Sequence, residues 1–263
     1  MVDKRCMMAL FARRLAWSAL TLFACVSPTA HALHPLITED TGTQGAGITQ
    51  VELTASHERD RDGASTTRRF DPSVTLSYGV ADAVDVFASV PYLRLRSESP
   101  GTTVSSSGWS DPTLGLKWRF YEQDNLSVAI KPAVLLAHGD ATRGLGKGRT
   151  GYSLPLVVTR QWDGFAFHTH LEVSRNRNTV GEREYLWHGS LAIEHQLNER
   201  LKWVLDLGAD RNPDPARKLH PAYLLGGAVY SFGRMELSAG IKAKLNAAAP
   251  DQAFLVGLTW HGK

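Results

Sequence analysis

Cysteine and long apolar runs are both scarce in this sequence, and each absence excludes a class of protein. The two cysteines, Cys6 and Cys25, lie within the first 32 residues, and none follows. The rest of the chain therefore holds neither a disulfide framework nor a thiolate metal site. No later stretch reaches the ~18 uninterrupted apolar residues that a spanning helix needs, which excludes a helical membrane protein.

An excess of one charge is also missing from most of the chain. The sequence has 29 basic and 26 acidic residues, and its first 32 residues contain four of the basic and one of the acidic ones. The remainder therefore carries 25 residues of each sign. Because this part is formally neutral, it lacks the basic footprint of a nucleic-acid-binding protein. We expect no nucleic-acid partner.

The first 32 residues have the pattern of a cleaved secretory signal peptide. Four basic residues precede or enter an apolar stretch at Leu15–Val26, and the small-residue pattern Ala30–Ala32 follows. This order predicts cleavage after Ala32 and a mature chain that begins at Leu33. A lipoprotein signal with Cys25 as the lipidated residue is the alternative.

Alternation between apolar and polar residues dominates the sequence after residue 47. In the segment 113–120, for example, one face carries Leu114, Leu116, Trp118 and Phe120 while the other carries charge, as at Lys117. A period of two indicates β-strands with one apolar and one polar face. Charge on one face of many successive strands is typical of an outer-membrane β-barrel, with lipid outside and a polar interior.

The alternating segments number twelve, and the links between them are short and long in turn. The short links are residues 81–83, 122–125, 161–164, 198–200 and 233–234, and the long ones are 97–108, 139–150, 175–183, 211–218 and 246–252. We therefore predict an all-β fold, a transmembrane antiparallel up-and-down β-barrel of twelve strands over residues 47–263. Short turns belong in the periplasm and long loops outside the cell.

Aromatic residues support this orientation because they gather at the strand ends. Those beside short turns or the chain end are Tyr78, Trp118, Trp162, Trp203, Tyr230 and Trp260, and those beside long loops are Tyr92, Trp109, Tyr152, Tyr185 and Tyr223. Trp and Tyr prefer both membrane interfaces, so the two groups predict two belts. The segment 223–232 is apolar on both faces, which leaves its orientation open.

Residues 33–46 precede the first strand and are polar and rich in glycine. We expect a loose N-terminal segment in the periplasm. The alternative is that this stretch folds into the barrel as a small plug. A twelve-stranded barrel is wider than the eight-stranded kind that side chains just fill and narrower than a sixteen-stranded porin, so its pore would be narrow, gated or plugged.

Several segments together resemble a bacterial family of outer-membrane transporters that is named for the meta-cleavage pathway of phenol degradation. The similar segments are His34–Glu52, Tyr78–Tyr92, Gly108–Phe120, Gly139–Tyr152 and Leu255–Trp260. They extend over nearly the whole chain after the signal. The resemblance implies a β-barrel and a link to aromatic compounds, and it supplies no catalytic residues. It also implies that the insertion machinery reads the final aromatic, Trp260.

Charged and histidine residues of mixed sign fall on the predicted interior faces. We predict that nine of them line a pore: Asp111, Lys117, Arg119, Lys131, His168, His170, Glu172, His188 and Asp206. The alternative is that these charges form a network of salt bridges and hydrogen bonds that fills the barrel and props it open.

The histidines raise two further hypotheses. His168, His170 and Glu172 share a face, and His188 on the next strand should lie near them, so imidazoles and a carboxylate could bind a divalent metal. We expect ordinary lumen residues there instead, with no metal and no cofactor. A membrane-embedded hydrolase would use Ser190 with His188 and an orienting group such as Glu172, but triads are recognised by geometry and not by spacing.

These observations together predict a protein of the Gram-negative outer membrane that is not an enzyme. We expect a passive channel or transporter for small molecules, with hydrophobic or aromatic compounds indicated by the family's name. Its partners would be outer-membrane lipid, the barrel insertion machinery and a small-molecule solute. The alternative is a non-conducting structural or adhesion barrel that acts through its extracellular loops.

Overall fold

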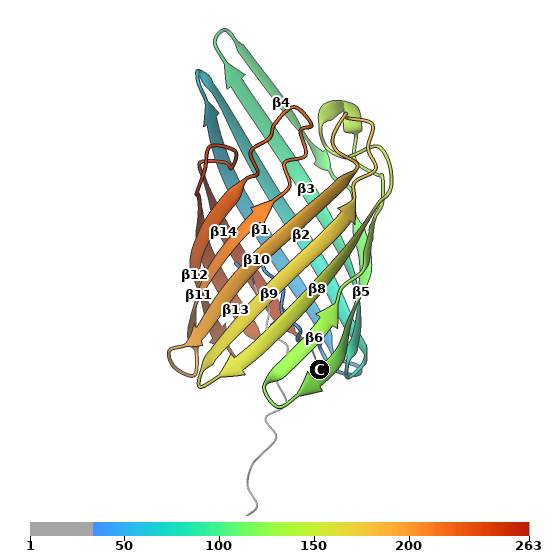
Figure 1. Cartoon of the computed structure of the whole chain (residues 1–263), viewed down its shortest axis with the longest axis vertical. Helices are drawn as coiled ribbons and strands as arrows, with labels where there is room; N and C mark the ends of the chain where they lie inside the picture. The colour runs from blue at the N-terminus through green and yellow to red at the C-terminus, as the bar shows by residue number, and fades with distance from the viewer. Residues whose placement is uncertain (1–33, 263) are drawn as a thin grey trace, which may run out of the picture.

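The computed structural model describes residues 34–262, and these form a closed antiparallel β-barrel (Figure 1). The expected signal peptide, its cleavage after Ala32 and the alternative at Cys25 lie outside the described residues. Within residues 34–262, no helix is both long and apolar enough to cross a bilayer.

Fourteen strands build the described barrel. They are β1 (Thr49–Asp62), β2 (Ser65–Ala81), β3 (Val84–Ser99), β4 (Thr102–Trp109), β5 (Thr113–Gln123), β6 (Leu126–Ile130), β7 (Ala133–Leu135), β8 (Gly151–Trp162), β9 (Phe165–Arg175), β10 (Tyr185–Gln196), β11 (Leu201–Asp210), β12 (Ala222–Phe232), β13 (Met235–Lys244) and β14 (Gln252–His261). Antiparallel pairing of β1 with β14, as at Gln50 and His261, closes the barrel.

Two of the spans are composite, so the fourteen strands make twelve passages, as predicted. β6 and β7 follow one another along the same neighbours, β5 and β8, and Pro132 separates them. Proline has no N–H to give to a sheet ladder, so the span is broken there. β4 and β5 likewise pair in succession with β3.

The alternation predicted from the sequence sorts the side chains as expected. Outward positions carry large apolar residues that are open to the surroundings, such as Leu53 and Leu76 with 47% and 49% exposure. Inward positions of the same strands carry polar residues, such as Gln50 on β1, which is buried. The exposed apolar surface is therefore the face that meets lipid.

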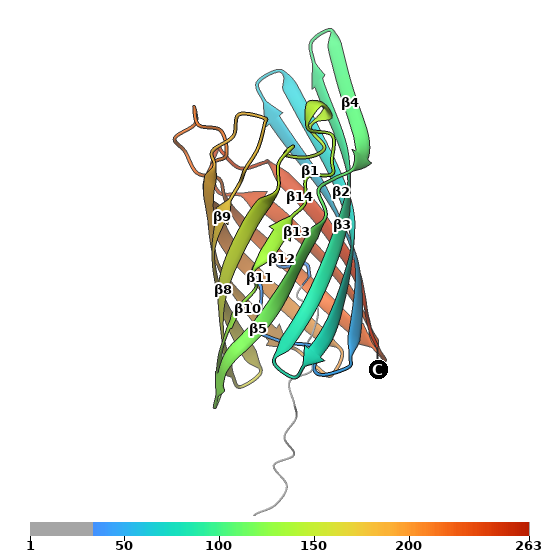
Figure 2. The same cartoon turned by 90° about the vertical axis from the view of Figure 1, so that its right-hand side faces the viewer.

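The two ends of the barrel differ in the way that the link lengths predict. Short turns close the lower end in Figure 1, and long connections crown the opposite end. Residues 97–108 are not the loop that we expected: β3 runs on to Ser99 and pairs with β4, so a hairpin projects beyond the barrel (Figure 2). β1 and β2 also extend further than predicted, to Asp62 and from Ser65.

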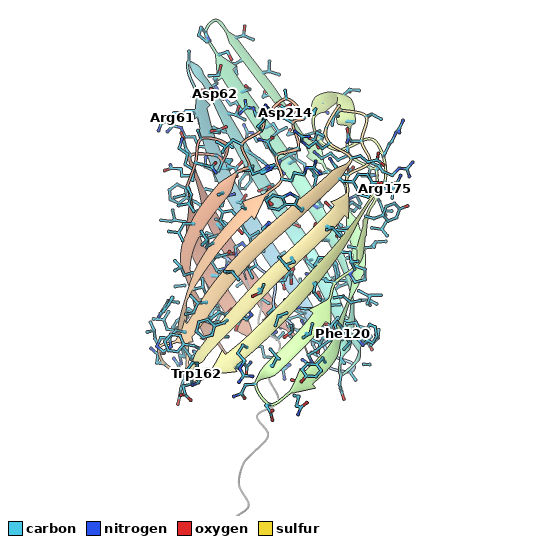
Figure 3. The ribbon with its side chains drawn as sticks, viewed as in Figure 1. Arg61, Asp62, Phe120, Trp162, Arg175 and Asp214 are labelled. Atoms are coloured by element: carbon cyan, nitrogen blue, oxygen red, sulfur yellow. The ribbon has the colours of Figure 1, made fainter. Side chains whose placement is uncertain are left out.

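Aromatic residues lie at both ends of the outer surface. Phe120 and Trp162 mark the end with the short turns in Figure 3, and Trp162 is 67% exposed. At the other end, Tyr92 and Trp109 pack edge to face with ring centroids 5.4 Å apart. Tyr223 is an exception to the predicted belts because it points inward and is buried.

Residues 34–46, which we call the inner segment, run through the barrel lumen. The prediction of a loose segment in the periplasm is therefore wrong. The structure has the alternative arrangement, in which this stretch folds into the barrel as a plug. Leu36 of this segment joins a buried apolar cluster with Leu225 and Val229 of β12. This contact explains why β12 is apolar on both faces: one face meets lipid and the other meets the inner segment.

Candidate functional site

A bend of the inner segment at Ile37 and Thr38 is held inside the lumen by Asp206 of β11. Asp206 Oδ2 accepts hydrogen bonds from the backbone N–H groups of Ile37 at 2.7 Å and Thr38 at 2.8 Å. The Thr38 hydroxyl lies 2.9 Å from Asp206 Oδ1 and 2.7 Å from Ser190 Oγ. Asp206 is completely buried, so these bonds satisfy a carboxylate that would otherwise be costly to bury.

Two acidic residues of the inner segment meet two lysines of the wall. Asp40 Oδ1 accepts a hydrogen bond from Lys117 Nζ at 2.6 Å, and Glu39 forms an ion pair with Lys131 Nζ and lies 3.7 Å from Lys117 Nζ. Burial by itself raises the pKa of Glu39, but the ammonium groups of Lys131 and Lys117 outweigh it and lower that pKa to about 2. Glu39 is therefore a fixed anion at physiological pH.

The end of the inner segment is tied to the periplasmic side of the barrel. The backbone N–H of Gln44 donates to both oxygens of Asp85 at 3.0 Å. The backbone N–H of Gly47 donates to the carbonyl of Gly79 at 2.8 Å. The segment thus enters the lumen beside the turn between β2 and β3 and crosses to the opposite wall.

The first described residues lie against a part of the wall where two neighbouring strands carry glycine. A Cβ placed on Gly240 of β13 would come within 2.9 Å of the Pro35 ring, and one placed on Gly227 of β12 would come within 2.6 Å of it. The two glycines face each other across the strand pair. His34 continues this contact, with its Nδ1 2.8 Å from Ser238 Oγ.

Two cavities lie beside and beyond the inner segment. The lower cavity has a volume of about 240 Å³ and is bounded by the inner segment and by interior residues of β1, β2, β3 and β5, among them Glu52 and Asp85. The second, which we call the vestibule, has about 370 Å³ and includes Glu172 and His188. Residues that line both cavities are Ile37, Glu39, Phe87 and Lys131.

The shared residues form the boundary between the two cavities, which we call the constriction. Lys131 Nζ pairs with Glu39 and also lies 4.8 Å from the centre of the Phe87 ring. A cation over an aromatic face is attracted by the ring. An ion pair with an aromatic neighbour therefore separates the vestibule from the lower cavity.

A hydrogen-bonded relay links the vestibule to the inner segment. His188 Nδ1 lies 2.8 Å from Asp210 Oδ1, and His188 Nε2 lies 2.9 Å from Ser190 Oγ. The group that orients His188 is therefore Asp210, and not Glu172 as the hydrolase hypothesis supposed. Glu172 is the residue opposite His188 on the neighbouring strand β9. Ser190 is buried, and its Oγ also contacts Thr38, so the relay ends on the inner segment.

Eight of the nine residues predicted to line the pore have side chains that point into the lumen. Most of these side chains contact other groups of the protein there and do not face open space. Lys117, Lys131, His170 and Asp206 all touch the inner segment. Arg119 lies near the periplasmic turns, where its Nε is 3.1 Å from Glu122.

Asp111 has a different place from the other eight. Its carboxylate accepts backbone N–H bonds from His138 at 2.9 Å, Gly139 at 2.8 Å and Lys147 at 2.7 Å. It therefore anchors the extracellular loop between β7 and β8.

The three histidines do not converge on one point. His170 and His188 are neighbours, with ring centroids 4.9 Å apart, as the strand order predicted. His168 instead has its Nδ1 2.9 Å from Thr159 Oγ1. Among residues 34–262, no group of three or more His, Cys, Asp or Glu side chains is arranged to hold a metal ion.

Sequence reasoning missed the residues that seat the inner segment. Ser190 was considered only as a nucleophile, and Gly227 and Gly240 were not singled out. One signal was present in the sequence, since both glycines occupy inward positions of neighbouring strands where polar residues would otherwise be expected. Asp85 also gave no separate signal among the other interior charges.

Comparison with solved structures finds other outer-membrane barrels. The COG4313 outer membrane channel from Pseudomonas putida F1 has a TM-score of 0.67 and 13% identity, covering 85% of this chain and 97% of that one. The translocator domain of the autotransporter NalP from Neisseria meningitidis has a TM-score of 0.51 and 10% identity over 97% and 95% of the two chains. The KdgM porin has a TM-score of 0.52 and 7% identity over 80% and 98%.

These likenesses confirm the barrel fold. A closed barrel with an apolar outward face is the form in which bacterial proteins span the outer membrane, which agrees with the location predicted from the sequence. No curated protein gives a significant match to the chain. The model of the family described as "Putative MetA-pathway of phenol degradation" matches residues 35–261. The match extends over nearly all of the described chain, and the protein belongs to this family.

Proposed function

We propose that the protein is a passive channel for small molecules, and that solutes pass beside the inner segment. The observation that carries this proposal is the pair of cavities that meet at Glu39, Lys131 and Phe87. The vestibule lies on one side of this constriction. The lower cavity lies on the other side, between the inner segment and β1–β3. A small movement of the Lys131 side chain would join them.

The chemistry of this path favours neutral solutes over ions. Lys117 and Lys131 are paired with Asp40 and Glu39, so the path has no continuous strip of one charge sign. Selectivity in pores follows from such rings or strips of charge and from pore width. The Phe87 ring adds an apolar surface at the constriction, which suits a small aromatic molecule.

Two of the comparisons support separate parts of this proposal. The family's description refers to phenol degradation, and the most similar structure described above is an outer membrane channel. Phenols and other small aromatic compounds are therefore the first solutes to test.

The test is solute uptake by proteoliposomes that contain the refolded mature chain, with folding checked by its heat-modifiable migration on gels. We expect small phenols to enter faster than sugars of similar mass and faster than ions. Uptake of none of these solutes by a folded barrel would contradict the channel and would favour a barrel that acts through its extracellular loops.

A reversible lock tests the route separately. The hydroxyls of Thr41 and Ser127 form a hydrogen bond, and the mature chain has no cysteine of its own. The double variant Thr41→Cys/Ser127→Cys should therefore form one disulfide that fixes the inner segment to β6. We expect phenol uptake to be the same before and after reduction. Uptake only after reduction would show that the inner segment must leave the lumen.

The relay of Ser190, His188 and Asp210 supports a hydrolase as a second candidate, because its order of contacts is that of a catalytic triad. Three features favour a structural role. Ser190 is buried, and Thr38 contacts its Oγ. The strand that carries Ser190 also pairs on both sides, so the backbone N–H groups that could stabilise an oxyanion are already occupied. Labelling of Ser190 by a fluorophosphonate probe would support the hydrolase, and we expect no labelling.

A further inference from the structure

Arginines form a row on the outward face of the strands that extend beyond the barrel. Arg59 of β1 faces Arg68 of β2, and Arg68 faces Arg96 of β3. Residues directly opposite in neighbouring strands lie ~5 Å apart at Cβ, and like charges there destabilise the pairing. The repulsion among these three guanidinium groups therefore destabilises the pairing of the three strands at this level.

This row has few acidic partners. Glu98 bonds with both Arg68 at 2.7 Å and Arg96 at 2.8 Å. Within residues 34–262, Arg59 Nε is buried without a hydrogen-bond partner, and Arg94 on the same face has no ion pair among the described residues. One glutamate therefore faces four arginines, and the face keeps a positive charge.

The basic face continues directly from the surface that meets lipid. Arg94 lies two residues beyond Tyr92 on the same side of β3, and Tyr92 packs against Trp109 of the outer aromatic belt. Phe70 of β2, with 40% exposure, pairs with Arg94. Figure 3 labels Arg61 and Asp62 near the tip of the neighbouring β1–β2 hairpin, far from Trp162 at the opposite end. The arginines thus lie at the height of the outer-leaflet headgroups.

We propose that this face, formed by Arg59, Arg68, Arg94 and Arg96, binds the phosphate groups of lipopolysaccharide, the anionic glycolipid of the outer leaflet. Arginine presents a planar fork of donors that matches a phosphate bidentately. Basic residues beside an apolar surface attract anionic lipids. A lipid A molecule could place its acyl chains on the apolar surface near Tyr92 and its phosphates on the arginines above.

The opposite side of the rim provides a matched control. Arg175 at the end of β9 is 52% exposed at its side chain, but its Nε is paired with Glu184 at 2.9 Å. It is a single paired arginine at the same end of the barrel, and Figure 3 shows it away from Arg61. Lipid A binding at the arginine row should not depend on it.

The experiment titrates diphosphoryl lipid A onto the folded, delipidated mature chain in a non-ionic detergent. The triple variant Arg68→Gln/Arg94→Gln/Arg96→Gln should bind roughly 100-fold more weakly, at ~1 kcal/mol for each arginine near a lipid surface. The control variant Arg175→Gln should bind like the native chain. Heat-modifiable migration verifies that both variants are folded.

Competitors identify the ligand. Lipid A without phosphates should bind as weakly as the triple variant, and inorganic phosphate at the same concentration should displace nothing. The proposal is overturned if the triple variant keeps native affinity or if Arg175→Gln loses as much. It is also overturned if phosphatidylglycerol or inorganic phosphate competes as well as lipid A, because the face would then be a general anion surface.

Discussion

The two sides of the lumen meet the inner segment in different ways. On the side of β10–β13, contacts are short and direct: Asp206 accepts two backbone N–H bonds, and Leu36 packs against Leu225. On the side of β1–β3 and β5, the segment contacts the wall directly at its end, where Gln44 donates to Asp85, and the lower cavity lies between the rest of the segment and this wall. Lys117 of β5, and Lys131 between β6 and β7, reach in to its acidic residues.

This difference assigns separate tasks to the two walls. The tightly packed wall fixes the position of the inner segment, and burial of a leucine such as Leu36 contributes ~1.5–3 kcal/mol to that docking. Away from Gln44, the other wall leaves room, and its contacts with the segment depend on long lysine side chains that can rotate. A solute that passes the segment should therefore pass on the side of the lower cavity.

Deletion of residues 34–44 should produce the largest change, because it removes both kinds of contact at once. The twelve-stranded wall would remain, while the lower cavity and vestibule would merge into one lumen. We expect uptake of sugars and ions by proteoliposomes to rise by roughly an order of magnitude, since barrel width then sets the limit.

The control for this deletion shortens the hairpin of β3 and β4, which projects beyond the barrel (Figure 2). That variant should keep native uptake. Equal uptake by the deletion variant and the native chain would show that the inner segment does not limit passage.

Removal of the Asp206 carboxylate should weaken only the tightly packed side. Asp206→Ala deletes the acceptor for Ile37 and Thr38, and bonds to a charged group are worth ~1.5–3 kcal/mol each. We expect faster backbone hydrogen exchange in residues 34–46 and a rise in sugar uptake smaller than that of the deletion. The control is Asp214→Ala, which changes a residue of an extracellular loop that is labelled in Figure 3. It should change neither the hydrogen exchange nor the sugar uptake.

The barrel itself was predictable because each strand's pattern is local. Alternation such as that from Thr113 to Phe120 shows at once which face meets lipid, and five short links identify the periplasmic end. Residues 97–108 were misjudged because Ser, Thr and Gly are common in loops. In the structure, pairing with β3 and the strand propensity of Thr102, Thr103 and Val104 extend the sheet instead. 

The inner segment was not predictable in the same way because its contacts are far apart in sequence. The bond from Thr38 N to Asp206 joins residues 168 positions apart, and no local period reports such a contact. Tyr223 was placed in a belt for a related reason: its strand is apolar on both sides, and only Leu36 reveals which side faces inward. The interior charges were found, but their partners were not.

A side chain at Gly240 tests whether the inner segment needs the glycines of β12 and β13 in order to dock. The Cβ of Gly240→Val would lie within 2.9 Å of the Pro35 ring, so the start of the inner segment must shift. We expect a modest rise in hydrogen exchange at residues 34–38 and a smaller rise in uptake than for Asp206→Ala. Gly189→Ala is the control, since a Cβ there would make only an ordinary contact, at 3.7 Å from Leu171; equal effects of the two variants would mean that docking does not depend on this wall.

The smallest expected change comes from a charge on the side of the lower cavity. Glu52 lines that cavity, and its carboxylate accepts a hydrogen bond from Gln50 of its own strand, so Glu52→Gln alters the path and keeps the bonds of the inner segment to Asp206, Lys117 and Lys131. At ~4 Å in a watery pore one charge is worth ~1 kcal/mol, which corresponds to a change of about two- to five-fold in the cation-to-anion permeability ratio. Phenol uptake should stay constant because the solute is neutral. Reversal potentials across a planar bilayer measure the ratio, with Glu184→Gln in an extracellular loop as the control. An unchanged ratio would place the ion path away from the lower cavity and would make the tightly packed side the one to re-examine.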